Sequence, residues 1–387
     1  MVPARVTDLP RARARFGERA SRLVTFFDRV DPLADAAVAV IETMPKGEGW
    51  RIVQEAGARG IGRVPGAPRP IRDLFDQIEA IPVWADWRTI DGAGDLLLRA
   101  GLLGGVVLGT KSLVHGYASP AGNKPLVLTG RLEQQASRRL NETARFVQAV
   151  CRRRGMRPFG EGWQIAIRVR LIHAQVRRMI LASGRWQADQ WGAPINQHDM
   201  AGTLLLFSFI VIEGLKSLGL QVDAEEAERY TQLWRLVGHV LGVEPEVNPG
   251  SMYDATRLAE IISAIQGAPD EDSRALTRAL LSSPLHDATT RAARRNAERQ
   301  CRFAEGMCRF LMGDELADAL DVPRTPWRYA APVLQRLVRG VELVRSSMPF
   351  GDAPAIAVGN HYWDRVVQLG LAGATAEFGL PEKLAAA

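Results

Sequence analysis

The sequence has only three cysteines among its 387 residues, Cys151, Cys301 and Cys308. Three thiols at these distances cannot build a disulfide framework, and no CxxC pair is present to bind a metal ion. Reduced thiols are usual in the cytosol, so the scarcity of cysteine favours an intracellular protein over a disulfide-stabilised secreted one.

Long hydrophobic runs are also missing. The longest, residues 204–212, ends at Glu213 and is far shorter than the roughly 20 residues that cross a bilayer. Arginines at positions 11, 13 and 15 interrupt the N-terminus, and no apolar segment typical of a signal peptide follows them. We therefore expect a cytoplasmic protein without a membrane span. The last five residues, 383–387 (KLAAA), resemble a vector-derived tail.

Charge of one sign is not concentrated anywhere. The chain has 49 basic and 43 acidic residues, a net charge of +6. The arginine-rich segments 11–22, 138–157 and 291–302 all mix basic residues with apolar or acidic ones. This pattern is more typical of solvated helix faces than of a nucleic-acid interface, and it is compatible with a basic site for an anionic cofactor.

Alternating strand patterns are absent, and helical periodicity dominates. Segments rich in proline and glycine separate the periodic stretches, no internal repeat occurs, and no linker is long enough to divide the chain. We predict one all-α domain over residues 1–382. Its expected helices lie near residues 11–30, 71–93, 129–152, 162–184, 197–219, 223–242, 252–266, 288–313 and 329–346.

The helix expected at 197 has a clear start signal. Asn196 is a candidate N-cap, and the carboxylate of Asp199 at the third helical position favours a helix N-terminus. We interpret these residues as capping chemistry and expect His198 on the surface of the first turn.

One histidine stands among arginines in the segment 168–178, RVRLIHAQVRR. At 3.6 residues per turn His173 falls at the edge of an apolar stripe, with Arg170 and Arg177 beyond it on the side away from the stripe. An imidazole bordered by two guanidinium groups suits a ligand with a metal at its centre and acids at its edge. The stripe consists of Val169, Ile172, Val176 and Ile180.

A second pattern lies on the preceding helix, in RRLNETARFV. Thr143 falls within its apolar stripe, with Arg139 one turn before it and Glu142 beside it. A short Gly/Pro turn joins the two helices, so they should pack antiparallel and bring Thr143 and His173 to a similar depth. This places a hydroxyl, a carboxylate and an imidazole around one cavity. The simpler alternatives are a threonine bonded to its own helix, a surface Arg–Glu pair and a packed core histidine.

Several kinds of site are missing from the sequence. There is no HExxH motif, His/Cys cluster, GxSxG, P-loop, GxGxxG or aspartate-rich motif. Haem fits the remaining pattern best, because a single imidazole suffices as the protein ligand and arginines pair well with propionates.

At these residues the sequence resembles a known family. RxxHAxxR and RRLxxT, together with WGAPINQHDMAGTLLLFSF and LWRLVGHVLGV, are similar to the latex clearing protein and MpaB-type oxygenases, formerly a domain of unknown function. The resemblance is strongest over residues 75–255. It implies a globin-reminiscent helical fold enclosing one haem b, and O₂-dependent oxidation of isoprenoid or other apolar compounds.

The resemblance also implies roles for individual residues. His173 would be the proximal iron ligand, and Arg170 and Arg177 would hold the propionates. Arg139, Glu142 and Thr143 would face the distal side. The apolar side chains expected to shape the pocket are Phe146, Leu206 and Phe207.

Two departures separate this chain from latex clearing proteins. Glu142 stands where they have a lysine that can cap the iron, and Asn123 and Lys124 occupy the region of their catalytic acid. With the missing export signal, these departures argue against cleavage of rubber itself.

We therefore predict a haem b-dependent oxygenase that uses O₂, and an electron donor where its reaction requires one, on a small hydrophobic substrate. Two alternatives stay open at this point. One is a non-enzymatic haem sensor or carrier, and the other is a helical bundle without a cofactor. The substrate and the oligomeric state do not follow from the sequence.

Overall fold

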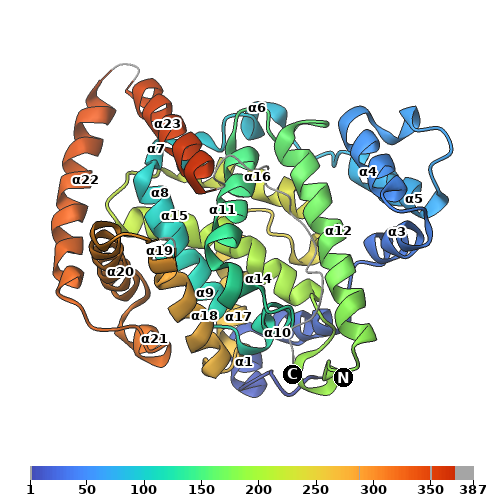
Figure 1. Ribbon diagram of the computed structural model, residues 1–387, viewed down its shortest axis with the longest axis horizontal. Coiled ribbons are helices and arrows are strands. Elements are labelled where there is room, and N and C mark those ends of the chain that lie inside the picture. Colours follow the sequence, from blue (N-terminus) through green and yellow to red (C-terminus); the bar gives the residue numbers. More distant parts are fainter. Residues whose placement is uncertain (1, 287, 349–350, 371–387) are drawn as a thin grey trace.

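The computed structural model describes residues 2–286, 288–348 and 351–370, apart from the side chains of residues 131–139 and 369–370. Within these ranges all the regular structure is helical, and the one β-type pairing is an isolated bridge between Val6 and Gln266. The prediction of an all-α fold is confirmed (Figure 1). The vector-like tail proposed at 383–387 lies outside the described residues.

The first half of the chain forms mostly short helices that end with the cavity-forming pair α11 and α12. Their bounds are α1 Leu9–Phe16, α2 Glu18–Val24, η1 Thr25–Asp28, α3 Pro32–Thr43, α4 Glu48–Arg59, η2 Ile61–Arg63, α5 Arg69–Glu79, α6 Trp87–Ile90, α7 Asp95–Ala100, α8 Leu102–Val107, η3 Leu108–Ser112, α9 Leu113–Tyr117, α10 Pro120–Leu128, α11 Arg131–Cys151 and α12 Glu161–Ala182.

The second half contains most of the helices that periodicity predicted. Their bounds are α13 Ala188–Trp191, α14 Gln197–Phe207, α15 Phe209–Ser217, α16 Ala224–Val240, η4 Pro245–Val247, α17 Met252–Ile265, α18 Glu271–Leu281, α19 Ser283–His286, α20 Arg291–Met312, α21 Asp314–Ala319, η5 Pro326–Tyr329, α22 Ala330–Ser347 and α23 Asp352–Gly370.

Four longer helices, α3, α4, α18 and α23, fall outside the predicted ranges. The helices from α7 to α10 were not predicted either. They are short pieces, the longest of nine residues, and Gly101 separates α7 from α8 with a positive φ of 49°. Periodicity needs a longer window to be visible. The segment YASPAGNKP was expected to be a break, yet Pro120 occupies the first turn of α10, where its missing N–H costs nothing.

The predicted helix 197–219 is interrupted at Ser208. This residue has φ −104° and ψ −86°, and its hydroxyl donates a 2.9 Å hydrogen bond to the carbonyl of Leu204. Such back-bonding competes with the helical ladder and bends helices. The buried hydroxyl of Tyr230 donates to the Phe207 carbonyl at 3.1 Å and so satisfies an acceptor next to the break.

The turn between α11 and α12 brings the two helices very close together. A Cβ added at Gly162 would lie 2.8 Å from the carbonyl oxygen of Ala149, so only glycine permits this approach. The helices pack against each other from this turn onward, as Figure 1 shows near its centre. The spacing argument that places Thr143 and His173 at one level depends on this packing.

The apolar residues form one large buried cluster that extends along the chain from Ala12 to Trp363. A smaller cluster lies around Val114, Leu281 and Cys308. This distribution is compatible with one domain, which stays a prediction.

One described stretch, Gln197–Ser217, is long and apolar enough to cross a membrane, and the bent pair Trp87–Ala100 with Leu102–Tyr117 passes the same test together. The first stretch is 61% buried within the protein. Core helices have the same composition, so this is weak evidence for a span.

Candidate functional site

A cavity of about 350 Å³ lies between α11, α12 and α14, with α9 and α10 closing one side. This volume is within the range of small-molecule sites. The cavity is lined mainly by apolar side chains, and the polar ones come from several helices. They include Tyr117, Asn123, Thr129, Glu142, Thr143, His173, Asp199 and Thr203.

Three of the side chains that the sequence singled out lie around this cavity. Glu142 and Thr143 reach it from α11, and His173 reaches it from α12. The hydroxyl, the carboxylate and the imidazole expected to share a cavity therefore do so. Arg139 was grouped with them, but its side chain lies outside the described residues.

The apolar walls also agree with the prediction. Phe146, Leu206 and Phe207 all line the cavity. Phe207 stacks on Trp234 with ring centroids 5.3 Å apart, and Phe146 meets the same indole edge-on at 6.2 Å. Three aromatic rings thus form a packed wall that fixes the shape of this side of the cavity.

The apolar stripe on α12 that sequence periodicity identified faces the cavity over much of its length. Val169, Ile172 and Val176 line the cavity, together with His173. The face of α12 that packs into the protein instead contains Trp163 and Leu171, both almost fully buried. Periodicity identified the apolar stripe correctly, and the cavity expected between the two helices lies against it.

Arg170 does not lie at the cavity, contrary to the expectation that it holds a propionate. Its guanidinium group is 3% exposed and forms two hydrogen bonds with Asp31, at 2.6 and 3.0 Å. It also donates to Gln77 Oε1 at 2.6 Å and to the carbonyl of Val240 at 3.2 Å. These partners occupy the donors of Arg170, so its role is to join α12 to α3, α5 and α16.

Arg177 is likewise buried on a face of α12 that does not line the cavity. It forms an ion pair with Asp35 and donates to the carbonyls of Pro194 and Ile195 at 3.1 and 3.2 Å. Asp31 and Asp35 are one turn apart at the start of α3, and they meet arginines two turns apart on α12. The two arginines that appeared to border a cofactor are instead the buried ties between these helices.

Asn123, on α10, contributes an amide to the cavity. Asn123 is 2% exposed and donates hydrogen bonds to the carbonyl of Tyr117 at 2.6 Å and to Ser273 Oγ at 3.3 Å. Lys124 turns away and pairs with Asp270 at 2.9 Å and with Asp272. Within the described residues, α10 therefore supplies no carboxylate to the cavity.

Asp199 is a cavity residue that sequence reasoning assigned only to helix capping. Asn196 is the N-cap as predicted, because its side chain accepts from Asp199 N at 2.9 Å. The Asp199 carboxylate, however, lines the cavity and accepts two 2.7 Å hydrogen bonds from Arg5. Burial alone would raise the pKa of Asp199, but the charge of Arg5 and hydrogen bonds from His198 and Arg5 hold that pKa well below its ordinary value. No local signal marks this role, since Arg5 is 194 residues away.

His198 is not on the surface, as the first-turn position suggested. It is 4% exposed, stacks on Phe27 with centroids 3.9 Å apart, and its Nδ1 lies 3.3 Å from Asp199. Burial lowers its pKa, and burial also lowers the pKa of His239. Of the six histidines, all within the described ranges, His173 alone lines the cavity.

His115 gives a pH dependence that can be measured. Burial, with a smaller contribution from the charge of Lys111, lowers the pKa of His115 to about 4, below its ordinary value of 6.5. The unfolded chain therefore takes up a proton at this residue below pH 6.5 while the folded chain does not. Above pH 6.5 the protonation of His115 costs no stability. As the pH falls from there toward 4, it lowers the free energy of unfolding by about 1.4 kcal/mol per pH unit.

We expect this loss to be smaller in His115→Gln, which cannot take up the proton. Urea unfolding of both proteins across this pH range measures the effect. The difference between their free energies of unfolding gives the contribution of His115, because His198 and His239 are present in both. Parallel curves for the two proteins would contradict the assignment.

The donors present fit a haem b held by one imidazole. Within the described lining there is a single imidazole, no thiol and a largely apolar surface, which would suit a haem held by one protein ligand. Arg170 and Arg177 do not line the cavity, and their role at the propionates stays a prediction. The fit therefore rests on His173 and the apolar walls.

Comparisons with known proteins agree with this fold. Residues 87–343 match a family model described as "ER-bound oxygenase mpaB/B'/Rubber oxygenase, catalytic domain". A rubber oxygenase from Streptomyces sp. (strain K30) is 24% identical over 277 residues, which are 70% of this chain and 64% of that protein. The chain thus spans less than two thirds of this curated relative.

A solved structure is also similar. The latex clearing protein LCP in the closed state superposes with a TM-score of 0.60 and 21% sequence identity, covering 88% of this chain and 90% of that one. At this identity the match establishes the fold.

Proposed function

The chain belongs to the family of MpaB-type and rubber oxygenase catalytic domains, and from this premise we propose that it is a haem b-dependent oxygenase that acts with O₂ on a small apolar molecule. The observation that carries the proposal is the cavity itself, in which a single histidine meets a carboxylate and a hydroxyl within largely apolar walls. Isoprenoid-like compounds are the substrate class that both this lining and the name of the similar rubber oxygenase support.

The walls of the cavity account for substrate binding. Phe146, Leu206 and Phe207 offer apolar and aromatic surface that removes a hydrocarbon from water. These side chains also exclude water from the reacting region.

The polar side chains account for cofactor and proton handling. His173 would hold the iron of haem b, which when bound would supply the activation of O₂. Glu142 would hold a proton on its carboxyl group or transfer it within the cavity, and Thr143 would donate a hydrogen bond from its hydroxyl. Each of these three residues reaches the same cavity from α11 or α12.

An absorption spectrum of the purified chain, expressed with sufficient haem, tests the cofactor. A Soret band and extraction of haem b are expected. Oxygen uptake is then measured with a reductant and a series of apolar compounds, from short isoprenoids to polyisoprene oligomers, and we expect uptake that depends on the compound.

The outcomes separate the alternatives. Absence of haem under these conditions would overturn the proposal in favour of a bundle without cofactor. Haem without substrate-dependent uptake would favour a sensor or carrier.

Glu142→Gln and Thr143→Val test the α11 side of the cavity. Glu142→Gln keeps the shape but removes the titratable proton, so we expect kcat to fall by about a hundredfold, with haem content unchanged. Thr143→Val removes one hydrogen-bond donor, and a fall of about tenfold is expected.

The matched control is Thr203→Val, on the α14 side of the same cavity. The hydroxyl of Thr203 donates to the carbonyl of Asp199 at 2.8 Å, within its own helix. This variant should retain near-normal turnover. Normal turnover in Glu142→Gln would dismiss that carboxyl group as a proton carrier.

A further inference from the structure

The outer helix α22 carries a stripe of apolar side chains that nothing in the described chain covers. The members repeat at intervals of four, four, three and four residues, so they share one face of the helix. Each is more than half exposed, which is unusual for a continuous apolar stripe. The stripe residues are Val333, Leu337, Val341, Val344 and, directly after the last helical residue, Met348.

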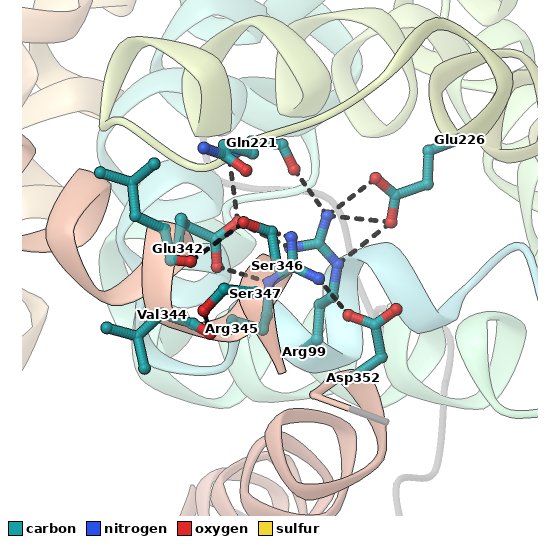
Figure 2. Close-up of polar contacts among 10 residues, drawn as sticks. Arg99, Gln221, Glu226, Glu342, Val344, Arg345, Ser346, Ser347 and Asp352 are labelled. Atoms are coloured by element: carbon teal, nitrogen blue, oxygen red, sulfur yellow. Dashed lines mark hydrogen bonds and ion pairs between the residues drawn. The ribbon is translucent and has the colours of Figure 1, made fainter. Parts of the chain in front are cut away.

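The opposite face of α22 is attached to the body by a buried ionic cluster (Figure 2). Glu342 is 4% exposed, and it accepts hydrogen bonds from Arg99 at 3.2 Å and from the backbone N–H of Gln221 at 3.0 Å. Arg345 binds Glu342 at 2.9 Å and also pairs with Asp352 at the start of α23. The side chain of Arg99 is itself only 2% exposed and also binds Glu226.

This cluster fixes the rotation of α22 about its axis. Turning the stripe inward would remove Glu342 from Arg99 and leave a buried charge without its partner, which is costly. A second attachment, the 2.8 Å hydrogen bond from Gln335 to the carbonyl of Ser217, is on the same inner side. The outward direction of the stripe is therefore built into the fold, and Figure 1 shows α22 at the margin of the molecule.

The ends and edges of the stripe indicate what it binds. Trp327 and Tyr329, in η5 just before α22, are 41% and 73% exposed. Arg336 is exposed beyond one edge of the stripe, whereas Arg339 lies on the inner side of α22 next to Gly219. The one acidic residue of that helix, Glu342, is buried and paired. Aliphatic side chains with aromatic residues at one end and an arginine at the edge are typical of helices that lie in a membrane interface.

The neighbouring helix α20 extends the positive charge. It packs against α22 and η5, and it exposes several arginines in its first half. Residues 291–348 hold eleven arginines and seven acidic residues. The exposed arginines on α20 are Arg291, Arg294, Arg295, Arg299 and Arg302.

We propose that α22 is a peripheral membrane-docking helix, whose stripe enters the interface of a bilayer that contains anionic lipid while the arginines contact the headgroups. A second copy of this chain is a poorer fit, because α22 offers arginines but no exposed carboxylate, so pairing two such helices would bring like charges together. Anionic lipid supplies both the apolar surface and the opposite charge.

Flotation of the purified full chain with phosphatidylcholine vesicles, with and without phosphatidylglycerol, tests the proposal. Binding is expected with the anionic vesicles, and it should weaken as salt is raised. Leu337→Glu with Val341→Glu places two charges in the stripe and should reduce vesicle binding by about tenfold or more. Arg299→Glu with Arg336→Glu should reduce binding to anionic vesicles to the level seen without phosphatidylglycerol.

The matched control is Val83→Glu with Leu181→Glu, which adds the same charge at two exposed apolar residues outside α22. This control should bind vesicles like the parent chain, and thermal unfolding of every variant shows whether it folds. Two results would overturn the proposal. One is the absence of binding by the parent chain, and the other is a dimer, measured by light scattering without lipid, that Leu337→Glu with Val341→Glu converts to monomer.

Discussion

Replacing His173 by alanine is expected to leave the purified chain essentially without haem. Within the described lining of the cavity His173 is the single imidazole, so the variant removes the one protein bond that the iron could form there. Haem content per chain, from the spectrum of the pyridine complex, measures the loss. His173→Gly offers a sharper form of the test, because free imidazole can enter the space left by the side chain and should restore haem binding.

Two control variants remove imidazoles from other places. His361 is exposed on α23, and His198 is buried beside Asp199 without lining the cavity. We expect haem retention in His361→Ala and in any His198→Ala protein that folds. Full haem content in His173→Ala would show that the assignment of the ligand is wrong, and haem loss in His198→Ala alone would move the ligand to that residue.

Replacing Arg170 by alanine is expected to destabilise the protein by about 3–5 kcal/mol, because it leaves the carboxylate of Asp31 buried without its partner. The side chains of this pair are 3% and 10% exposed, so solvent cannot compensate for the lost charge. Unfolding in urea measures the change. Because Arg170 does not line the cavity, haem content should remain near normal at temperatures where the variant is folded.

Arg178 provides a matched control on the same helix. Its ion pair with Glu42 at 2.8 Å is about 40% exposed on both sides, so Arg178→Ala should change stability by about 1 kcal/mol or less. If Arg170→Ala kept normal stability but lost haem readily, the arginine would belong to the cofactor site after all, as its place beside His173 in the sequence suggests.

The sequence by itself determined the local features of this protein. Helical periodicity predicted α11, α12, α16, α17, α20 and α22, and the N-cap at Asn196 followed from residue type. The meeting of Thr143 and His173 could also be predicted, because a short turn sets the register between two adjacent helices. The family motifs lie on these same helices, so the sequence alone was enough to recognise them.

Contacts between distant segments were decided by the tertiary structure alone. Arg170 lies beyond the apolar stripe as the helical wheel required, but its partner Asp31 is 139 residues away and no spacing rule selects it. Asp199 has a capping signal in the sequence, while its place at the cavity and its lowered pKa depend on packing and on Arg5. The stripe on α22 has the same periodicity as a core helix, and the Arg99–Glu342 cluster, with the hydrogen bond from Gln335 to Ser217, turns it outward. Periodicity determines which residues share a face, because that is set by the helix itself, whereas what covers the face is set by long-range packing.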